Sequence, residues 1–299
     1  MNKKDAENKK CNLCPRRCNV DRSRETGFCG AAETIKAAAA MLHFGEEPPI
    51  SGKNGSGAVF FTGCNMRCVF CQNYKISHLG YGKEISVDRL SEIFLELQEK
   101  GAENINLVTA THYVKQIIKA LEAVKYRLII PVVFNCGGYE SVETVKMLDG
   151  LADIYLPDVK YCSEELAVRY SKAVGYFDAA YSAVEEMVRQ TGRYVMENGL
   201  MKKGVIIRHL VLPGCYKDSI LLFNKLKNLS GKVLISVMRQ YYPCGKIAGF
   251  PELNRKLTTF EYNKVLNECE RLGFDGFAQE KESACGEMTP DFDLTGILP

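Results

Sequence analysis

Short apolar runs alternate with amphipathic stretches along most of the chain after residue 57. The apolar runs have the length and composition of buried strands, and the stretches between them repeat their apolar residues with a helical period. The sequence predicts strands at 58–62, 105–108, 128–134, 154–156, 205–212 and 233–238, with a seventh at 274–278. It predicts helices at 87–100, 112–125 and 142–148, two within 163–191, and two more at 217–229 and 259–272.

Strands that alternate with helices indicate βαβ units and a parallel sheet. The stretch after residue 57 is shorter than the roughly 250 residues typical of a closed eightfold barrel. We therefore expect an α/β fold in which residues 51–299 form a partial (β/α)6 barrel of the TIM type. Residues 1–50 form a Cys-rich N-terminal extension, in which the alanine run 37–40 favours a helix by its propensity.

The composition is that of an ordinary globular protein, with 46% hydrophobic and 25% charged residues. No apolar run approaches the roughly 20 residues that span a bilayer, and the charged start lacks the apolar stretch of a secretory signal. These features predict a cytoplasmic protein with no membrane partner. The 13 cysteines are then expected to be reduced, as metal ligands or small buried side chains. A net charge of +3 gives no reason to expect nucleic acid.

Three cysteines with the spacing CxxxCxxC follow the first predicted strand: Cys64, Cys68 and Cys71. They lie at the carboxyl edge of the predicted sheet, where the sites of such folds gather. Three thiols can bind three irons of a cubane [4Fe–4S] cluster and leave the fourth iron open for a reactant. The alternative, a structural zinc ion, usually needs a fourth ligand, for which His78 is the nearest candidate.

The cysteine loop 63–73, with Phe70 before the third cysteine, resembles that of the radical S-adenosylmethionine (radical SAM) superfamily. Within it the chain is most similar to the pyruvate formate-lyase activating enzyme-like proteins. Residues 156–160, Leu-Pro-Asp-Val-Lys, resemble their Asp-x-Lys strand end. Residues 208–214 resemble their Arg-containing strand that ends in Pro-Gly. The resemblance extends from Gly57 nearly to the C-terminus.

The resemblance implies a radical SAM oxidoreductase that uses a [4Fe–4S] cluster and S-adenosyl-L-methionine (SAM). The reduced cluster cleaves SAM to a 5′-deoxyadenosyl radical, which abstracts hydrogen from a substrate. One expected substrate is a glycine of a partner enzyme (glycyl radical activation), and the alternative is a small molecule or peptide. A low-potential donor such as flavodoxin or ferredoxin would supply the electron. The alternative from another class is a non-catalytic metal-binding module for nucleic acid or protein.

The resemblance also implies which side chains hold SAM. Lys160 and Arg208 are cations suited to its carboxylate, with a salt bridge to Asp158 as the alternative. The usual Gly-Gly-Glu is replaced here by 109–111, Thr-Ala-Thr, which leaves the contact to the SAM amino group open, and Glu140 lies too far along to supply it. The expected SAM-binding residues are Phe70, Asn73, Thr109, Asn135, Asp158, Lys160 and Arg208.

Five cysteines lie near predicted strand ends or loops, where a thiol could relay hydrogen, although buried packing is the usual role of a free cysteine. They are Cys136, Cys162, Cys215, Cys244 and Cys285. Cys269 falls in a helical pattern and is expected to pack.

The N-terminal extension supplies four more cysteines within 19 residues, and this density predicts a second metal site holding zinc or an Fe–S cluster. They are Cys11, Cys14, Cys18 and Cys29, which we call the N-terminal thiols. The surrounding residues 1–24 are strongly basic. Such a run is usually a solvated tail; a docking surface for an acidic electron donor or protein substrate is the alternative. Few aromatic residues are interleaved there, which argues against a nucleic-acid site in which aromatic side chains stack on bases.

Overall fold

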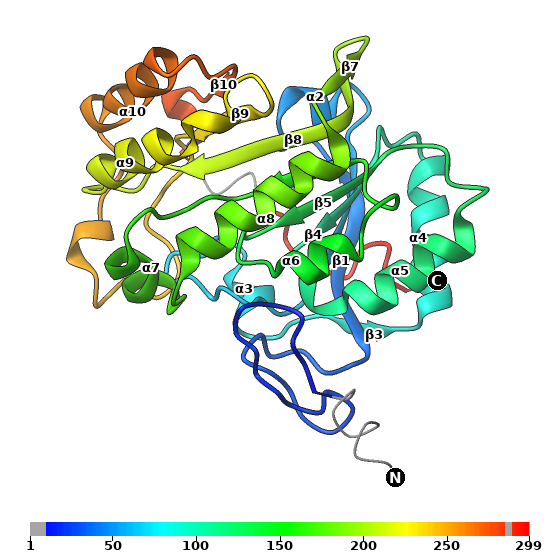
Figure 1. Ribbon diagram of the computed structural model, residues 1–299. Helices are drawn as coiled ribbons and strands as arrows, with labels where there is room; N and C mark the ends of the chain where they lie inside the picture. The colour runs from blue at the N-terminus through cyan, green and yellow to red at the C-terminus, as the bar shows by residue number, and fades with distance from the viewer. Residues whose placement is uncertain (1–9, 285–288, 299) are drawn as a thin grey trace.

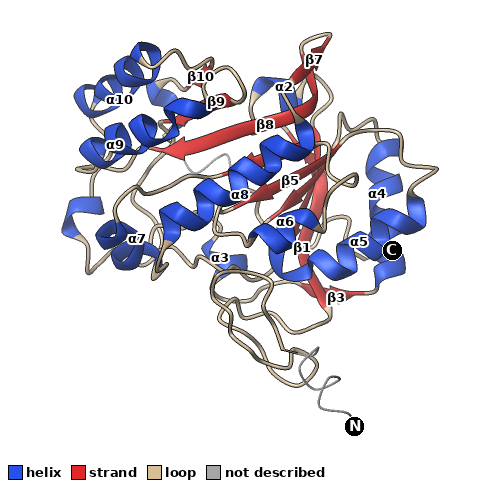
Figure 2. Cartoon of the chain, in the orientation of Figure 1, coloured by secondary structure: helices blue, strands red, loops and turns tan. Residues whose placement is uncertain are grey.

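The computed structural model describes residues 10–284 and 289–298, and its described strands form one curved sheet with helices packed along it (Figures 1 and 2). Its parallel strands are, in order, β2 (Ser56–Phe61), β4 (Ile105–Val108), β5 (Val132–Cys136), β6 (Ile154–Pro157), β8 (Leu200–Leu210), β9 (Leu234–Met238) and β10 (Gly276–Ala278). Next to β2 the sheet continues with two antiparallel strands, β1 (Ile35–His43) and β3 (Lys83–Ile85), and β7 (Val195–Glu197) pairs with β8.

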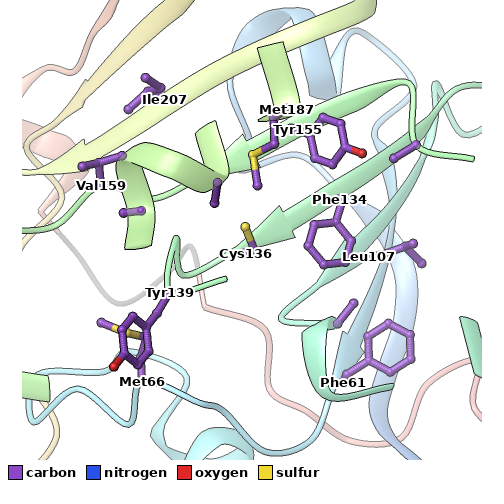
Figure 3. Close-up of a cluster of buried hydrophobic side chains, with 14 of the residues drawn as sticks. Phe61, Met66, Leu107, Phe134, Cys136, Tyr139, Tyr155, Val159, Met187 and Ile207 are labelled. Carbon is purple, nitrogen blue, oxygen red and sulfur yellow. The ribbon is translucent and has the colours of Figure 1, made fainter. Parts of the chain in front are cut away.

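The two ends of the described sheet, β10 and β3, are not paired with each other. The predicted partial α/β barrel is therefore confirmed, and its seven predicted strands correspond to the seven parallel strands. The central strands β2, β4, β5 and β6 are buried at every residue, as expected for strands covered on both faces. On one face, Leu107, Phe134, Tyr155 and Ile207 belong to the main hydrophobic core, together with Met187 of α8 (Figure 3).

The helices between the strands also agree with the predicted order. The longer ones are α4 (Val87–Glu99), α5 (Val114–Val124), α6 (Val142–Lys146), α7 (Glu164–Ser171), α8 (Tyr176–Thr191), α9 (Tyr216–Leu226) and α10 (Thr259–Arg271). Two one-turn helices, α2 (Pro48–Ser51) and α3 (Tyr74–Ser77), were not predicted. Ser86, Ser141, Ser163 and Thr258 each accept a hydrogen bond from a first-turn N–H, so side-chain caps fix four of the helix starts. None of the described helices is long and apolar enough to cross a bilayer.

The helix predicted from the alanine run is wrong, because residues 37–40 lie within strand β1. One edge of β1 pairs with β2, and its other edge pairs with β3 through Ile35–Ala37. Beyond that, the edge is covered by the C-terminal segment: Leu294 N–H donates to Ala38 O at 3.0 Å and Ala40 N–H to Thr295 O at 2.8 Å. Tertiary pairing on both edges therefore overrides the helix propensity of alanine.

Residues 10–34 contain turns and bends but no helix or strand, and they pack on the barrel. The guanidinium of Arg16 donates to Asn65 O and Ser171 O, both at 2.9 Å, and Arg22 is only 8% exposed. The solvated-tail prediction is therefore wrong for these two arginines, while residues 1–9 lie outside the described part of the chain. The sheet begins at Ile35, before the boundary predicted at residue 50; the division into two domains stays a prediction.

Candidate active site

A cavity of about 670 Å³ lies inside the partial barrel, at the carboxyl ends of its strands. The cysteine triplet (Cys64, Cys68 and Cys71) lines it on one side. All seven residues expected to hold SAM also line it, although they come from separate parts of the chain: Phe70, Asn73, Thr109, Asn135, Asp158, Lys160 and Arg208. The structure therefore brings every one of these predicted site residues together.

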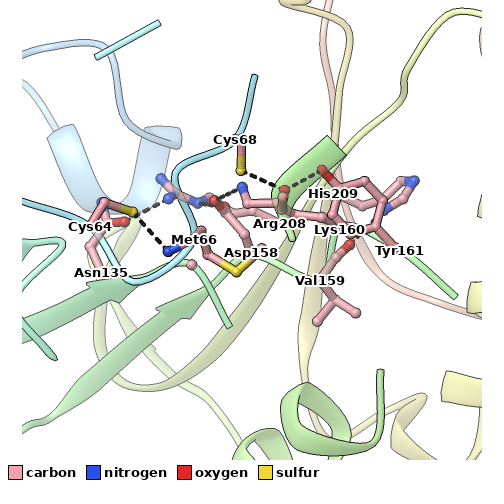
Figure 4. Close-up of polar contacts among 12 residues, drawn as sticks. Cys64, Met66, Cys68, Asn135, Asp158, Val159, Lys160, Tyr161, Arg208 and His209 are labelled. Atoms are coloured by element: carbon pink, nitrogen blue, oxygen red, sulfur yellow. Dashed lines mark hydrogen bonds and ion pairs between the residues drawn. The ribbon is translucent and has the colours of Figure 1, made fainter. Parts of the chain in front are cut away.

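The triplet loop begins at Gly63, whose φ of 95° is unfavourable for other residues. A Cβ atom there would lie 2.7 Å from the carbonyl oxygen of Cys29, so only glycine allows this approach. Each triplet sulfur accepts one hydrogen bond. Met66 N–H donates to Cys64 at 3.3 Å (Figure 4). Ser171 Oγ donates to Cys68 at 3.0 Å, and Ser77 Oγ donates to Cys71 at 3.2 Å.

The triplet suits a cationic cluster. Burial raises the pKa of Cys64 to about 11 and that of Cys71 to about 12, and neighbouring thiols add to the shift. Deprotonated thiols in this place therefore need a compensating positive charge, which bound iron supplies. The hydrogen bonds point toward the sulfurs, as a thiolate requires. The residues present thus fit three corners of a [4Fe–4S] cluster.

The zinc alternative finds no support at the triplet. His78 stacks on Tyr74, with ring centroids 4.3 Å apart, and its Nδ1 is 2.8 Å from Ser77 Oγ. His78 is not among the residues lining the cavity. Within residues 10–284 and 289–298, no three His, Cys, Asp or Glu side chains are arranged to hold a single metal ion.

Arg208, near the carboxyl end of β8, is the centre of an ionic network that lies beside the triplet (Figure 4). Its guanidinium donates to Asp158 Oδ1 at 3.0 Å, to Glu46 Oε2 at 2.9 Å and to Asn135 Oδ1 at 2.6 Å. Lys160 Nζ lies 2.5 Å from the other oxygen of Asp158. The salt bridges expected as the alternative role of Lys160 and Arg208 are therefore present in the chain without SAM.

Opposite charges keep this network ionised. Burial alone would lower the pKa of Arg208, but Asp158, Glu46 and Glu47 outweigh it and raise that pKa. Burial likewise opposes the charge of Asp158, whose pKa is nevertheless lowered by Arg208 and Lys160. Lys160 also keeps a raised pKa, because Asp158 and the nearby Cys68 thiol outweigh its burial. Two fixed cations therefore border the space beside the triplet.

Glu46 and Glu47 were not predicted as site residues. They follow strand β1, and both line the cavity. Glu46 Oε1 accepts hydrogen bonds from Asn106 at 2.9 Å and from Asn135 at 3.2 Å, so protein donors stabilise this carboxylate. Glu47 is only 8% exposed, and its Oε2 has no hydrogen-bond partner. The only signal in the sequence was an acidic pair before two prolines. Because β1 runs antiparallel to β2, the loop after β1 brings this pair to the cavity.

Of the five cysteines considered for hydrogen relay, only Cys136 lines the cavity. Cys244, Cys162 and Cys215 are not among the lining residues, although the sulfur of Cys244 is 3.3 Å from the carbonyl oxygen of Phe70, which does line the cavity. Cys285 lies outside the described residues. Cys269 is buried in α10, as expected for packing. No relay role follows from these positions.

The four N-terminal thiols line a second, small pocket of about 10 Å³. All four are free of disulfides. Asn65, from the triplet loop, lines the same pocket, together with Thr111 and His112. Phe28 N–H donates to the sulfur of Cys18 at 3.4 Å. The extension thus collects its cysteines at one place, directly behind the triplet loop.

Comparison with known proteins identifies the family. Residues 58–220 match the sequence profile of the Radical SAM superfamily. The uncharacterized protein MJ0674 of Methanocaldococcus jannaschii is 34% identical over 281 residues, which cover 89% of this chain and 76% of that protein.

Two solved structures share the fold at low sequence identity, and a third is also similar. Methylornithine synthase (PylB) superposes with a TM-score of 0.51 at 14% identity, over 100% of this chain and 80% of that one. A spore photoproduct lyase mutant gives 0.50 at 14% identity, over 77% of this chain and 78% of the other. Streptococcus suis SuiB bound to S-adenosylmethionine gives 0.49 at 13% identity, and the match spans 48% of SuiB, about half its length, and 73% of this chain. On its sequence match, the chain belongs to the Radical SAM superfamily.

Proposed function

We propose that this protein cleaves SAM reductively in the barrel cavity and abstracts hydrogen from a substrate bound there. The observation that carries the proposal is the convergence of the cysteine triplet and the two cations, Lys160 and Arg208, on one cavity. Family membership implies a [4Fe–4S] cluster and SAM, which together supply a 5′-deoxyadenosyl radical. It also favours an enzyme over the alternative of a non-catalytic metal-binding module.

The chain's own residues bind and orient SAM in this proposal. Lys160 and Arg208 bind its carboxylate, and in doing so they share their charge with Asp158. The backbone of Phe70 contacts the adenine, while its ring stays packed edge-on against Tyr241, 6.1 Å away. Asn73, Thr109 and Asn135 supply polar contacts to the amino group and ribose. The buried walls exclude water, which would otherwise quench a radical.

The substrate is either a glycine of a partner enzyme or a small molecule or peptide. The glycine assignment, with its pyruvate formate-lyase activating enzyme-like chemistry, rests on the strand-end motifs at 156–160 and 208–214. Deuterium transfer separates the candidates: substrate deuterated at the abstracted position should put deuterium into 5′-deoxyadenosine. Fractionating an anaerobic cell extract by this assay identifies either a protein or a low-molecular-weight fraction as the substrate.

We further propose that the N-terminal thiols hold a second metal. The convergence of all four on one pocket supports this. A low-potential carrier such as flavodoxin or ferredoxin is the proposed electron donor. This proposal for the electron donor does not depend on the basic residues 1–24 as its docking surface.

Replacing the cysteine triplet tests the main proposal. The anaerobically reconstituted protein with dithionite and SAM should form 5′-deoxyadenosine slowly without substrate. The Cys64→Ala, Cys68→Ala and Cys71→Ala triple variant should form none, because no iron remains to bind SAM. Cys269→Ala, which removes a buried thiol of α10, is the matched control and should retain the product. Deoxyadenosine from the triple variant above the protein-free background contradicts the proposal.

A further inference from the structure

The N-terminal thiols lie within one hydrogen bond of the triplet. The backbone N–H of Cys64 donates to the carbonyl oxygen of Cys29 at 3.1 Å, so a member of one thiol set contacts a member of the other. Two side chains reinforce this contact: Arg16 donates to Asn65 O at 2.9 Å, and Arg67 donates to Phe28 O at 3.3 Å. Figure 1 shows the extension below the sheet, beside α3, which immediately follows the triplet loop.

The spacing of these four cysteines is more typical of an Fe–S cluster than of zinc. Three lie close together, at Cys11, Cys14 and Cys18, and the fourth follows at a distance, at Cys29. Ferredoxin sequences use such a group of three with a remote fourth ligand. Structural zinc sites with four cysteine ligands more often use two separate CxxC pairs. Only one CxxC pair occurs in this extension.

The pocket between the thiols sets what a cluster would require of the segment around it. A cubane binds each thiol at a different iron, and it therefore needs a wider separation than a single ion does. The pocket between the thiols has room for about one water molecule, so a cubane requires them to move outward. Residues 10–34 contain bends, turns and one isolated bridge but no helix or strand, and such a segment can make this adjustment more easily than a helix or strand.

We propose that Cys11, Cys14, Cys18 and Cys29 hold a second [4Fe–4S] cluster, which delivers electrons to the triplet site through the hydrogen bond between Cys29 and Cys64. This inference rests on the proposed function, because it assigns the route by which SAM cleavage receives its electron. Four cysteine ligands leave no open iron, so the second cluster transfers electrons and binds no substrate.

The electron count balances with one external donor. A low-potential one-electron carrier, such as reduced flavodoxin, is oxidised by one electron and reduces the N-terminal cluster from the 2+ to the 1+ state. That electron then passes to the triplet site, and the N-terminal cluster returns to 2+. Cleavage of one SAM to methionine and the deoxyadenosyl radical consumes this single electron. No proton is exchanged in the transfer.

Metal content tests the cluster itself. The reconstituted protein should contain about eight irons, and both the triplet triple variant and the Cys11→Ala, Cys14→Ala, Cys18→Ala variant should contain about four. The latter keeps Cys29, so the backbone contact to Cys64 is retained. Cys269→Ala should keep all eight. About four irons in the parent protein, or zinc in the N-terminal site, overturns the inference.

Electron resonance tests the route. In the fully reduced parent protein, two adjacent paramagnetic clusters should give a broadened, spin-coupled signal, and each variant should give the simple signal of one cluster. SAM should perturb the signal of the N-terminal variant and leave that of the triplet variant unchanged. Freeze-quenched samples mixed with reduced flavodoxin should show the triplet-site signal growing about tenfold more slowly in the N-terminal variant, equivalent to a barrier about 1.4 kcal/mol higher. With dithionite the difference should be smaller.

Uncoupled spectra in the parent protein, or equal reduction rates in the parent and the N-terminal variant with flavodoxin, overturn the proposed route. These readouts do not depend on SAM cleavage. If coupling and slower reduction are observed but no deoxyadenosine is ever formed, the electron route stands and the proposed function fails. If deoxyadenosine is formed but the parent holds only about four irons, the proposed function stands and the second cluster fails.

Discussion

Glu46 and Glu47 are adjacent, but their carboxylates receive very different numbers of hydrogen bonds from the protein. Glu46 accepts hydrogen bonds from Arg208, Asn106 and Asn135, and Glu46→Gln should lower the free energy of unfolding by about 2 kcal/mol, the usual cost of losing a charged hydrogen bond. Glu47 has one buried oxygen without a partner, and burial raises its pKa. Glu47→Gln should therefore raise the free energy of unfolding at pH 8.

The pH dependence has a definite sign. Because the pKa of Glu47 is higher in the folded protein than in the unfolded chain, ionisation costs stability as the pH rises above the ordinary value of 4.5. The advantage of Glu47→Gln should be greatest at pH 8 and should disappear near pH 4.5. Urea unfolding of the SAM-free protein at both pH values measures it. A loss of stability in both variants at pH 8 would contradict this difference between the two carboxylates.

Lys160 should contribute to SAM binding more than to cluster assembly. Lys160 lines the cavity, its ammonium group pairs with Asp158, and the nearby Cys68 adds to the effect of Asp158 in raising its pKa. Lys160→Met should weaken SAM affinity about tenfold, since a hydrogen bond to a charged group contributes about 1.5–3 kcal/mol. Iron content should stay the same. Lys225→Met, a cation over the ring of Phe177 and outside the cavity lining, is the control and should leave SAM affinity unchanged. If both variants bind SAM with the same affinity, Lys160 does not bind SAM and its role is the salt bridge to Asp158.

At the level of single residues, the sequence located the site from chemistry that is local in the chain. The triplet, Lys160 and Arg208 all sit at or just beyond predicted strands, and parallel strands bring such ends to one edge. Glu46 and Glu47 could not be found in this way. They reach the cavity from the loop after an antiparallel strand, and the hydrogen-bond partners of Glu46 lie at least 60 residues away in sequence.

At the scale of elements, the parallel strands were predictable because they are short apolar runs, and β2, β4, β5 and β6 are buried at every residue. Strand β1 was not, because its alanines have high helix propensity and its two edges are occupied by distant segments. The short elements β3, β7, α2 and α3 lack the length for a periodic signal. Helix starts were better marked: Ser86, Ser141, Ser163 and Thr258 are residues of the type preferred at an N-cap.

The start of α10 should contribute to stability beyond its cap. Thr258 and Glu261 form a capping box, and Glu261 Oε1 also accepts from Gly214 N–H, at 2.7 Å, in the loop after β8. Thr258→Ala should cost about 1 kcal/mol. Glu261→Ala should cost more, about 2–3 kcal/mol, because it also leaves the Gly214 N–H without its partner. Glu270→Ala, on an exposed part of the same helix, is the control.

The two substitutions also differ in pH dependence. Hydrogen bonding to Arg255 lowers the pKa of Glu261, with Thr258 and Gly214 adding to the effect. Stability from this carboxylate is therefore present above its ordinary pKa of 4.5 and is lost as the pH falls below it. The difference between the parent and Glu261→Ala should narrow between pH 6 and pH 3 in thermal unfolding. A constant difference across this range would show that Glu261 acts by packing rather than by charge.

At the scale of the whole molecule, both ends of the described chain pack against the open barrel. The N-terminal extension covers the back of the triplet loop, and the C-terminal segment hydrogen-bonds along the edge of β1. Phe292 packs edge-on against Phe60, with ring centroids 5.5 Å apart, and Thr289 and Pro290 line the cavity. Closure of the site therefore depends on chain segments that carry no helical or strand periodicity, and hydrophobic patterning alone could not predict it.

Gly296 tests whether the C-terminal segment helps to enclose the site. Its φ is +68°, and a Cβ atom would lie 2.2 Å from the carbonyl oxygen of Ala40. Gly296→Ala should cost about 3 kcal/mol, because it combines an unfavourable backbone conformation with a steric clash against β1. Gly150→Ala, at a φ of +77° with nothing within 4 Å, should cost only about 1 kcal/mol.

The same two variants distinguish an effect on the stability of the fold from an effect on the enclosure of the cavity by the C-terminal segment. If the C-terminal segment shields the cavity, a ferrous chelator should remove iron faster from the Gly296→Ala protein than from the parent, while Gly150→Ala should lose iron at the parental rate. Both rates are measured anaerobically, well below the unfolding temperature of each variant, so that only local opening contributes. Faster unfolding of Gly296→Ala with an unchanged rate of iron loss would mean that this segment stabilises β1 without enclosing the active site.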